Sequence, residues 1–209
     1  MRAPQRKPRE PIRQAEFDRR TAYANEVLNP KLWIASAEDL FATARLIEPE
    51  LRLRWRSIAE RSKRAQPITI HAVYILLIGF AVENLLKSRI VKFDRKAWRR
   101  KILESGKLPE EFKGNHDLLR LARRARLRLR REDEETMRRL TRFTRWAGRY
   151  PVPGDSAKLD PVEIFDDGKP GYVGHLMQSD LDHFPRFLVA LASRFKISID
   201  LSLGAPAND

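Results

Sequence analysis

Residues 72–82 read AVYILLIGFAV, which is the longest apolar run in the chain. Wound into a helix, they place apolar side chains on every face, and this pattern predicts a helix buried on all sides. The run has eleven residues, whereas a helix needs about 20 to cross a bilayer. Glu83 and Asn84 follow it directly. We therefore expect a central core helix over residues 68–91, opened by Pro67, in a soluble protein.

The chain before this helix predicts a second long helix and a basic arm. Asn29-Pro30 is a typical helix start, because Asn caps free N–H groups and Pro suits the first helical position. Apolar residues recur at helical spacing across residues 33–58, and Pro49 leaves open one long helix or a broken pair. Residues 1–28 are rich in Pro and basic residues. We expect a partly disordered arm there, with a short helix over residues 16–27.

The chain after the core helix predicts shorter helices, at about residues 98–103, 115–125, 132–147 and from residue 180 onwards. Residues 150–178 are less regular, and the pattern over residues 162–173 predicts a small hairpin. The last residues, 204–209, are expected to fray. Together these elements predict an all-α, up-and-down bundle of four to five helices. It forms a single domain over residues 29–203, with an irregular insert before the last helix.

The composition narrows the class of protein. Cysteine is absent, which excludes disulfides and fits a reducing compartment, so we expect a cytoplasmic protein. No apolar stretch follows the basic residues 1–14, so no signal peptide is expected. No glycine-rich phosphate loop and no Gly-x-Ser-x-Gly motif occurs. Metal-ligand spacing is missing around all four histidines, which are His71, His116, His175 and His183. We therefore expect no metal and no cofactor.

The charge is strongly basic and unevenly distributed. A formal net charge of +14 favours an anionic partner, either nucleic acid or an acidic protein surface. Residues 120–149 hold twelve Arg against four acidic residues. More than half of the net charge therefore lies in a seventh of the chain, and this part is the candidate contact surface.

Two groups of arginines make up this region. On the predicted fourth helix a spacing of four, three and four residues gives one row, formed by Arg138, Arg142, Arg145 and Arg149. Such a row suits the phosphates of a nucleic acid backbone. The alternative is a solvated face opposite the core, with Glu134 and Glu135 offsetting its charge. A second group lacks the offset by interspersed acidic residues, and this local excess favours a binding surface. It comprises Arg120, Arg123, Arg124, Arg126, Arg128, Arg130 and Arg131.

His116-Asp117 stands at the predicted start of the third helix, where Asn115 is a candidate cap. A histidine at this place either packs and caps locally or faces a pocket at the helix end. Glu83 and Lys87 lie four residues apart near the end of the core helix and form an i,i+4 pair of the favourable polarity.

Four motifs, in chain order, resemble those of the HEPN superfamily. They are NPKLW at 29–33, FAVENLLK at 80–87, HDLL at 116–119 and RYP at 149–151. The resemblance covers about residues 29–151. It implies an α-helical bundle, often a homodimer, that binds RNA or nucleotides. Many members are ribonucleases of toxin–antitoxin, phage-defence or RNA-processing systems, with antitoxin partners, and others pair with a small nucleotidyltransferase.

The resemblance also implies a site at the polar motif positions. In such a bundle the ends of the second and fourth helices lie near the start of the third. The expected grouping is Glu83, Lys87, His116, Arg145, Arg149 and Tyr150. Glu83 would orient a guanidinium, the arginines would hold phosphate, and Tyr150 would stack on a base. The alternative for Arg149-Tyr150 is a buried helix-end clamp on Glu83.

Active ribonucleases of the superfamily carry Arg, four to six residues, then His near the start of a late helix. The pair supplies a cation for the scissile phosphate and an imidazole for acid–base chemistry, without a metal. Here the late helix has no such His, and the only match, Arg64 with His71, spans the start of the core helix. RNA or nucleotide binding is therefore the leading hypothesis. The alternatives are a metal-independent ribonuclease using His116 and Arg149, and a non-catalytic regulatory protein with a basic face.

Overall fold

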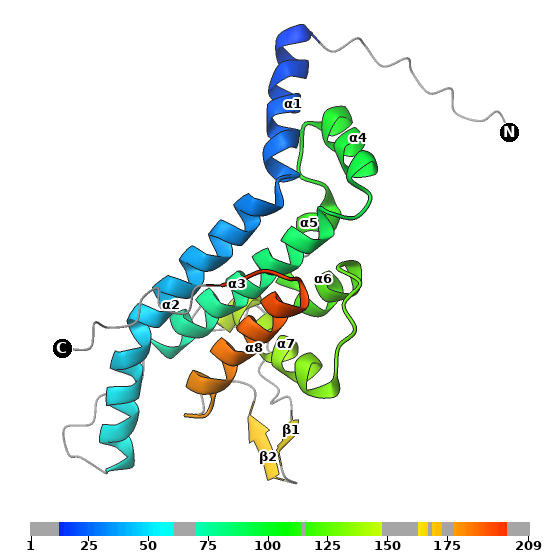
Figure 1. The fold of residues 1–209 in the computed structure, drawn as a ribbon. Coiled ribbons are helices and arrows are strands. Elements are labelled where there is room, and N and C mark those ends of the chain that lie inside the picture. The colour runs from blue at the N-terminus through cyan, green and yellow to red at the C-terminus, as the bar shows by residue number, and fades with distance from the viewer. Residues whose placement is uncertain are drawn as a thin grey trace, which may run out of the picture.

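The fold is a helical bundle, as the sequence predicts. The computed structural model describes residues 13–60, 70–113, 116–147, 163–166, 169–172 and 178–199. Within them, the elements in chain order (Figure 1) are α1 (Gln14–Val27), α2 (Pro30–Ala59), α3 (His71–Ile90), α4 (Arg95–Ser105), α5 (Glu110–Lys113), α6 (Leu118–Arg124), α7 (Arg131–Arg142), the π-helical turn η2 (Phe143–Ala147), β1 (Glu163–Asp166), β2 (Lys169–Tyr172) and α8 (Asp180–Arg194). No helix in these ranges is long and apolar enough to cross a membrane.

α3 is the central helix, which confirms the prediction from the apolar run. It shares its most extensive contact with α2 and also packs against α6, α7, η2 and α8. Its core side chains, among them Ile75, Ile78 and Leu85, are fully buried, and each such burial contributes roughly 1.5–3 kcal/mol. The helix begins at His71, and the predicted start at Pro67 lies outside the described residues.

α2 is one continuous helix, which decides between the two alternatives left by Pro49. At its start the Asn29 side chain accepts a hydrogen bond from the Lys31 N–H at 3.1 Å, as predicted. Trp33 donates from Nε1 to the Val27 carbonyl at 2.8 Å and ties the end of α1 to α2. Pro49 lies on the exposed side of the helix, where water can solvate the carbonyl that loses its N–H partner.

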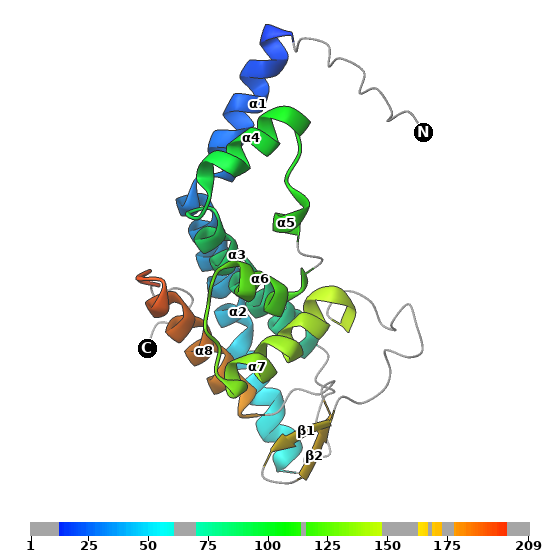
Figure 2. The ribbon, with the colours of Figure 1, turned by 90° about the vertical axis from the view of Figure 1, so that its right-hand side faces the viewer.

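α1 makes the second half of the predicted arm part of the bundle. The short helix expected over residues 16–27 is confirmed, whereas residues 1–12 lie outside the described ranges. Ala24, Val27 and Leu28 are buried in the core. α1 also packs against α4, at the end of the molecule away from α8 (Figure 2).

α4 confirms the predicted short helix near residues 98–103, and its end is held by α1. Arg20 donates from Nη1 to the carbonyls of Leu103 at 2.8 Å and Glu104 at 2.7 Å. Both carbonyls lie in the last turn of α4, where no helical N–H reaches them. Gly106 ends the helix with a φ of +66°, and a Cβ there would lie 3.2 Å from Arg20 Nε.

α6 and α7 confirm the predicted third and fourth helices, with two changes. The N-cap of α6 is Asp117, whose side chain accepts a hydrogen bond from the Arg120 N–H at 3.0 Å. Asn115, the predicted cap, lies outside the described residues. The predicted fourth helix is not α-helical throughout, because it widens into η2 over its last five residues.

η2 packs tightly on α3. The hydroxyl oxygen of the buried Thr144 lies 3.1 Å from the His116 carbonyl oxygen and 3.2 Å from the Leu140 carbonyl oxygen, so both are acceptors within reach of its one proton. A hydroxyl that bonds the preceding turn distorts a helix locally. A Cβ on Gly79 of α3 would lie 2.5 Å from Thr144 Cγ2. The close approach of α3 and η2 therefore depends on the glycine.

The C-terminal part contains the predicted hairpin and the last helix. β1 and β2 pair antiparallel, with Glu163 opposite Tyr172. α8 begins at Asp180, as predicted. The apolar face of α8 is buried, as expected, through Leu181, Phe184, Phe187, Leu188 and Leu191.

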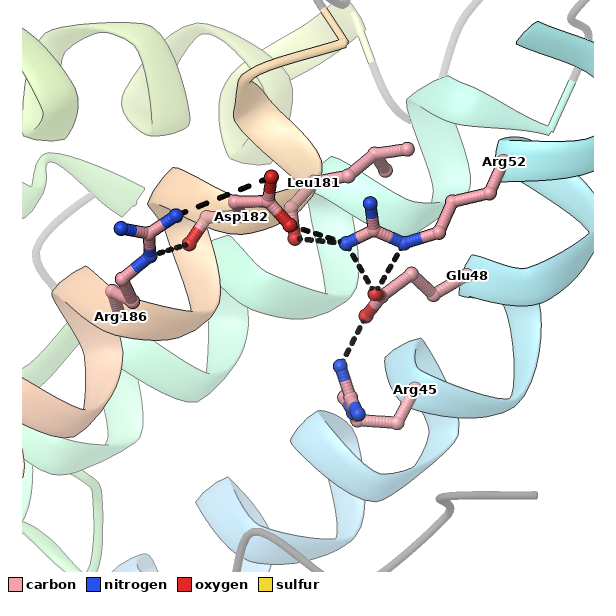
Figure 3. Close-up of polar contacts among 6 residues, drawn as sticks. All are labelled: Arg45, Glu48, Arg52, Leu181, Asp182 and Arg186. Carbon is pink, nitrogen blue, oxygen red and sulfur yellow. Dashed lines mark hydrogen bonds and ion pairs between the residues drawn. The ribbon is translucent and has the colours of Figure 1, made fainter. Parts of the chain in front are cut away.

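A polar network joins α8 to α2 (Figure 3). Glu48 of α2 is only 5% exposed and accepts hydrogen bonds from Arg45 Nη1 at 2.6 Å and Arg52 Nε at 2.8 Å. Arg52 Nη2 also reaches Asp182 Oδ1 of α8 at 2.5 Å. The buried carboxylate is neutralised by its own helix, and Arg52 carries the link to α8.

Arg52 also compensates for a proline inside α8. Pro185 has no N–H to donate to the Leu181 carbonyl four residues earlier. Arg52 Nη2 donates to that carbonyl instead, at 3.3 Å (Figure 3). The backbone group that the proline would leave without a partner is thus satisfied by α2.

Candidate functional site

Glu83 and His116, two residues of the predicted site, are in contact where α3 meets the start of α6. His116 Nδ1 lies 2.9 Å from Glu83 Oε2. The other oxygen of Glu83, Oε1, pairs with Lys87 Nζ at 2.6 Å. Glu83 is 3% exposed, so a lone charge there would be costly, and its two partners balance it within the site.

The imidazole of His116 is partly exposed. Its side chain retains 35% of its exposure, and one side of the ring packs against Phe80 with ring centroids 5.4 Å apart. Among the described residues no side chain or carbonyl bonds to Nε2. When Nδ1 donates to Glu83, the Nε2 of the neutral ring is a proton acceptor.

The backbone at His116 is held in an unusual conformation. Its φ is +58°, a left-handed value that is uncommon for residues other than glycine. The Thr144 hydroxyl holds its carbonyl, and two residues on, the Leu118 N–H donates to Thr141 Oγ1 at 3.1 Å. Strained residues of this kind persist only when their surroundings hold them, and they cluster at functional sites.

Lys87 is a buried partner of Glu83 in the Glu83–His116 pair. It is buried, and its ammonium lies over the Trp33 ring, 5.1 Å from the centroid. Trp33 belongs to the NPKLW motif at the start of α2. This motif is therefore connected to Glu83 through Lys87.

The predicted arginine row on the fourth helix interacts mainly with the protein itself. Arg138 lies 3.5 Å from Glu134, as the solvated-face alternative expects. Arg145 Nη2 lies 3.0 Å from Asp117 Oδ2, next to His116 in the chain. Burial lowers the pKa of Arg142 from its ordinary value, and this side chain has a partner within the protein.

Arg149 and Tyr150 lie outside the described residues, so their predicted approach to Glu83 stays a prediction. Of the expected grouping, the structure brings Glu83, Lys87 and His116 into direct contact.

The second arginine group forms what we call the arginine segment, residues 118–131. It contains seven Arg and no acidic residue. Leu121, Ala122 and Ala125 are buried against the bundle, so the arginines occupy the outer side of α6. The exposed members of the segment are Arg120, Arg123, Arg126, Arg128, Arg130 and Arg131.

An alternation in the sequence explains why the arginines after α6 stay exposed. Residues 126–130 read RLRLR and are not helical. Leu127 and Leu129 pack against the core, whereas the arginines beside them are exposed. A period of two places alternate side chains on opposite sides of an extended chain. This signal is visible in the sequence, but a search for helical spacing overlooks it.

Few acidic residues offset the arginine segment. Arg131 pairs with Glu135 at 3.1 Å, and Arg126 lies 3.9 Å from Asp94. In the part of the chain that the structure describes, no ion pair forms at the side chains of Arg120, Arg123, Arg124 or Arg128. The arginine segment is therefore less compensated than the row on the fourth helix.

The other histidines have structural surroundings or lie elsewhere. His183 Nε2 lies 2.8 Å from Thr136 Oγ1, and its ring packs on Phe184. His175 is outside the described residues. Within the described ranges no group of three His, Asp or Glu side chains is placed to hold a metal ion.

No family model matches the chain, and neither curated proteins nor solved structures provide a match.

Proposed function

We propose that this HEPN-like bundle binds RNA through the arginine segment. One observation carries the proposal: residues 118–131 hold seven arginines and no acid, and their charge is largely uncompensated. Arginines in such numbers neutralise phosphates and release counterions, which is the main source of affinity for a nucleic acid backbone. The resemblance to RNA-binding HEPN proteins favours RNA, and a toxin–antitoxin or phage-defence setting is part of this proposal.

The test is the salt dependence of binding to a labelled single-stranded RNA, measured by fluorescence anisotropy. The variant Arg120→Gln/Arg123→Gln/Arg128→Gln removes three uncompensated charges. It should reduce the slope of log affinity against log salt by about 2, because each phosphate contact on a single strand contributes roughly 0.7.

The matched control is Arg138→Gln, since Arg138 is already offset by Glu134. It should leave the slope almost unchanged. Equal effects of the control and the triple variant would contradict the proposal. If no RNA or DNA binds at low salt, the basic face serves an acidic protein partner instead.

A second candidate is a metal-independent ribonuclease, which the Glu83–His116 contact favours. In this reaction His116 Nε2 would take the proton of an RNA 2′-hydroxyl, and Glu83 would stabilise the imidazolium that forms. The 2′-oxygen would bond to the phosphorus as the P–O5′ bond breaks, and the leaving 5′-oxygen would take up a proton from the imidazolium or from water. A cation such as Arg145 or Arg149 would face the phosphate. The purified protein should then cleave RNA in the presence of a chelator, and His116→Ala should abolish cleavage. Absence of cleavage by the unmodified protein would remove this candidate.

The proposal includes a homodimer, which the HEPN resemblance implies. Leu32, Leu46 and Leu53 are exposed apolar residues of α2, and they recur at multiples of seven positions, which keeps them on one face. Asp39 is exposed on the same face.

A further inference from the structure

A cavity of about 640 Å³ lies between the α4–α5 loop and α6, apart from the Glu83–His116 contact. We call it the loop pocket. One wall comes from residues 101–111, and α6 contributes Arg120 and Arg124 to the other. Its volume is in the range of small-molecule sites.

The charges in the loop pocket leave positive groups available. Glu111 pairs with Lys101, a bond that lowers the pKa of Glu111 and keeps it ionised. Glu110 pairs with Lys113 at 2.5 Å. Glu104 is a third carboxylate in the lining, and Glu111 is also attracted by Arg124. By contrast, across the described ranges no carboxylate forms an ion pair with Lys107, Arg120 or Arg124.

The walls are fixed before any ligand arrives. Arg20 holds the end of α4, as shown above, and Phe112 of α5 is fully buried with its ring edge-on to Trp98 at 5.0 Å. Pro109 is buried and Leu108 is half-buried, so they add an apolar surface to the pocket. A preformed pocket avoids the ordering cost of binding.

We propose that the loop pocket binds one phosphorylated nucleotide unit. Its phosphate would lie between Lys107, Arg120 and Arg124, and its base and sugar would rest on Leu108 and Pro109. Arginine binds phosphate through paired N–H donors, and lysine does so as a point charge. The unit is either the phosphorylated end of an RNA or a free nucleotide. The RNA form rests on the proposed function, because Arg120 and Arg124 also belong to the arginine segment.

The test compares three probes: single-stranded RNA with a terminal monophosphate, the same RNA with hydroxyl ends, and adenosine monophosphate. The phosphorylated RNA should bind on the order of tenfold tighter than the hydroxyl form. Adenosine monophosphate should compete with it and raise the Tm of the protein. Inorganic phosphate at the same concentration should do neither, and equal effects of phosphate would overturn the assignment to a nucleotide.

Three variants distinguish binding in the loop pocket from binding by the arginine segment. Lys107→Gln, which changes the one proposed phosphate contact outside the arginine segment, should reduce the preference for the terminal phosphate while retaining most binding of hydroxyl-ended RNA. Arg128→Gln, outside the pocket, should weaken both RNAs equally. Lys96→Gln, an exposed lysine of α4 that does not line this cavity, should change neither.

The outcomes distinguish the two proposals. If RNA binds with no preference for the terminal phosphate and adenosine monophosphate has no effect, the loop pocket is refuted as a site, and the proposal that the arginine segment binds RNA stands. If RNA fails to bind but adenosine monophosphate raises the Tm, the arginine-segment proposal fails and the loop pocket is a free-nucleotide site. If neither binds, both are refuted.

Discussion

Gly79 lies where α3 and η2 come closest, and replacing it tests whether that contact is as tight as the geometry indicates. In Gly79→Ala the new methyl group would start 2.5 Å from Thr144 Cγ2, well inside contact distance. Overpacking of a core costs about 1–3 kcal/mol. Alanine in place of glycine inside a helix gains roughly 1 kcal/mol. The clash outweighs the gain, so we expect a net loss of up to about 2 kcal/mol in the free energy of unfolding.

A second change should reverse the sign of this effect. Thr144→Ser removes the obstructing methyl group and keeps the hydroxyl that bonds the His116 carbonyl. The next neighbours of the Gly79 position are Leu140 O at 3.5 Å and Leu140 Cβ at 3.8 Å, which are ordinary contacts. In the Thr144→Ser background, Gly79→Ala should therefore stabilise the protein by up to about 1 kcal/mol.

The assay is equilibrium unfolding in urea at neutral pH, with all four proteins of the double-mutant cycle compared at constant m-value. A Gly79→Ala substitution that destabilises both backgrounds equally would refute the reasoning, because the cost would then not come from Thr144.

Three further predictions follow from other contacts. Arg52→Gln should cost about 1–3 kcal/mol in urea unfolding and be partly rescued by Pro185→Ala, which restores an N–H for the Leu181 carbonyl. An Arg131→Gln control, which breaks the exposed pair with Glu135, should stay within about 0.5 kcal/mol, and lack of rescue would count against the carbonyl bond. Burial alone raises the pKa of Asp133, but hydrogen bonds from Arg194 and the Arg130 N–H outweigh it and lower that pKa overall. The contribution of Asp133 to stability is therefore present above the unfolded pKa of about 3.9 and is lost as the pH falls through the folded value. Asp133→Asn should cost stability at pH 7 and much less in strong acid, and a loss independent of pH would contradict this. Leu46→Glu/Leu53→Glu should convert a dimer into a monomer in light scattering, whereas a Lys96→Glu control on α4 should not, and a monomeric unmodified protein would rule out the dimer.

Much of the bundle could be predicted because local signals and burial agree. The apolar run at residues 72–82 has no polar face, so the sequence predicts a central position, and within the run only Val73 near its start is exposed. The Asn29 cap and the apolar side of α8 are similarly local. The widening of the fourth helix into η2 could not be predicted in this way. It depends on Thr144 meeting α3 and the His116 carbonyl, which are distant in sequence.

The site was predictable only in part, for a related reason. Glu83 and Lys87 are neighbours on one helix, and the HEPN resemblance added His116. Spacing along the fourth helix favoured its arginine row, because sequence alone does not reveal partners such as Asp117 for Arg145. The arginine segment stands out once its partners are known. The loop pocket depends on Arg20, which lies 83 residues before Leu103 and carries no sequence signal for that role.

The link from Arg52 to α8 has a consequence for the order in which the newly made chain can fold. Leu181 lies 129 residues after Arg52, and at about 5–20 residues per second a ribosome needs roughly 6–26 s to add that length. During this interval Glu48 already has Arg45 and Arg52 within one turn on either side. The Glu48 carboxylate of the emerging α2 is therefore neutralised from the outset, and α8 can pack against α2 last without having to supply a partner for that charge.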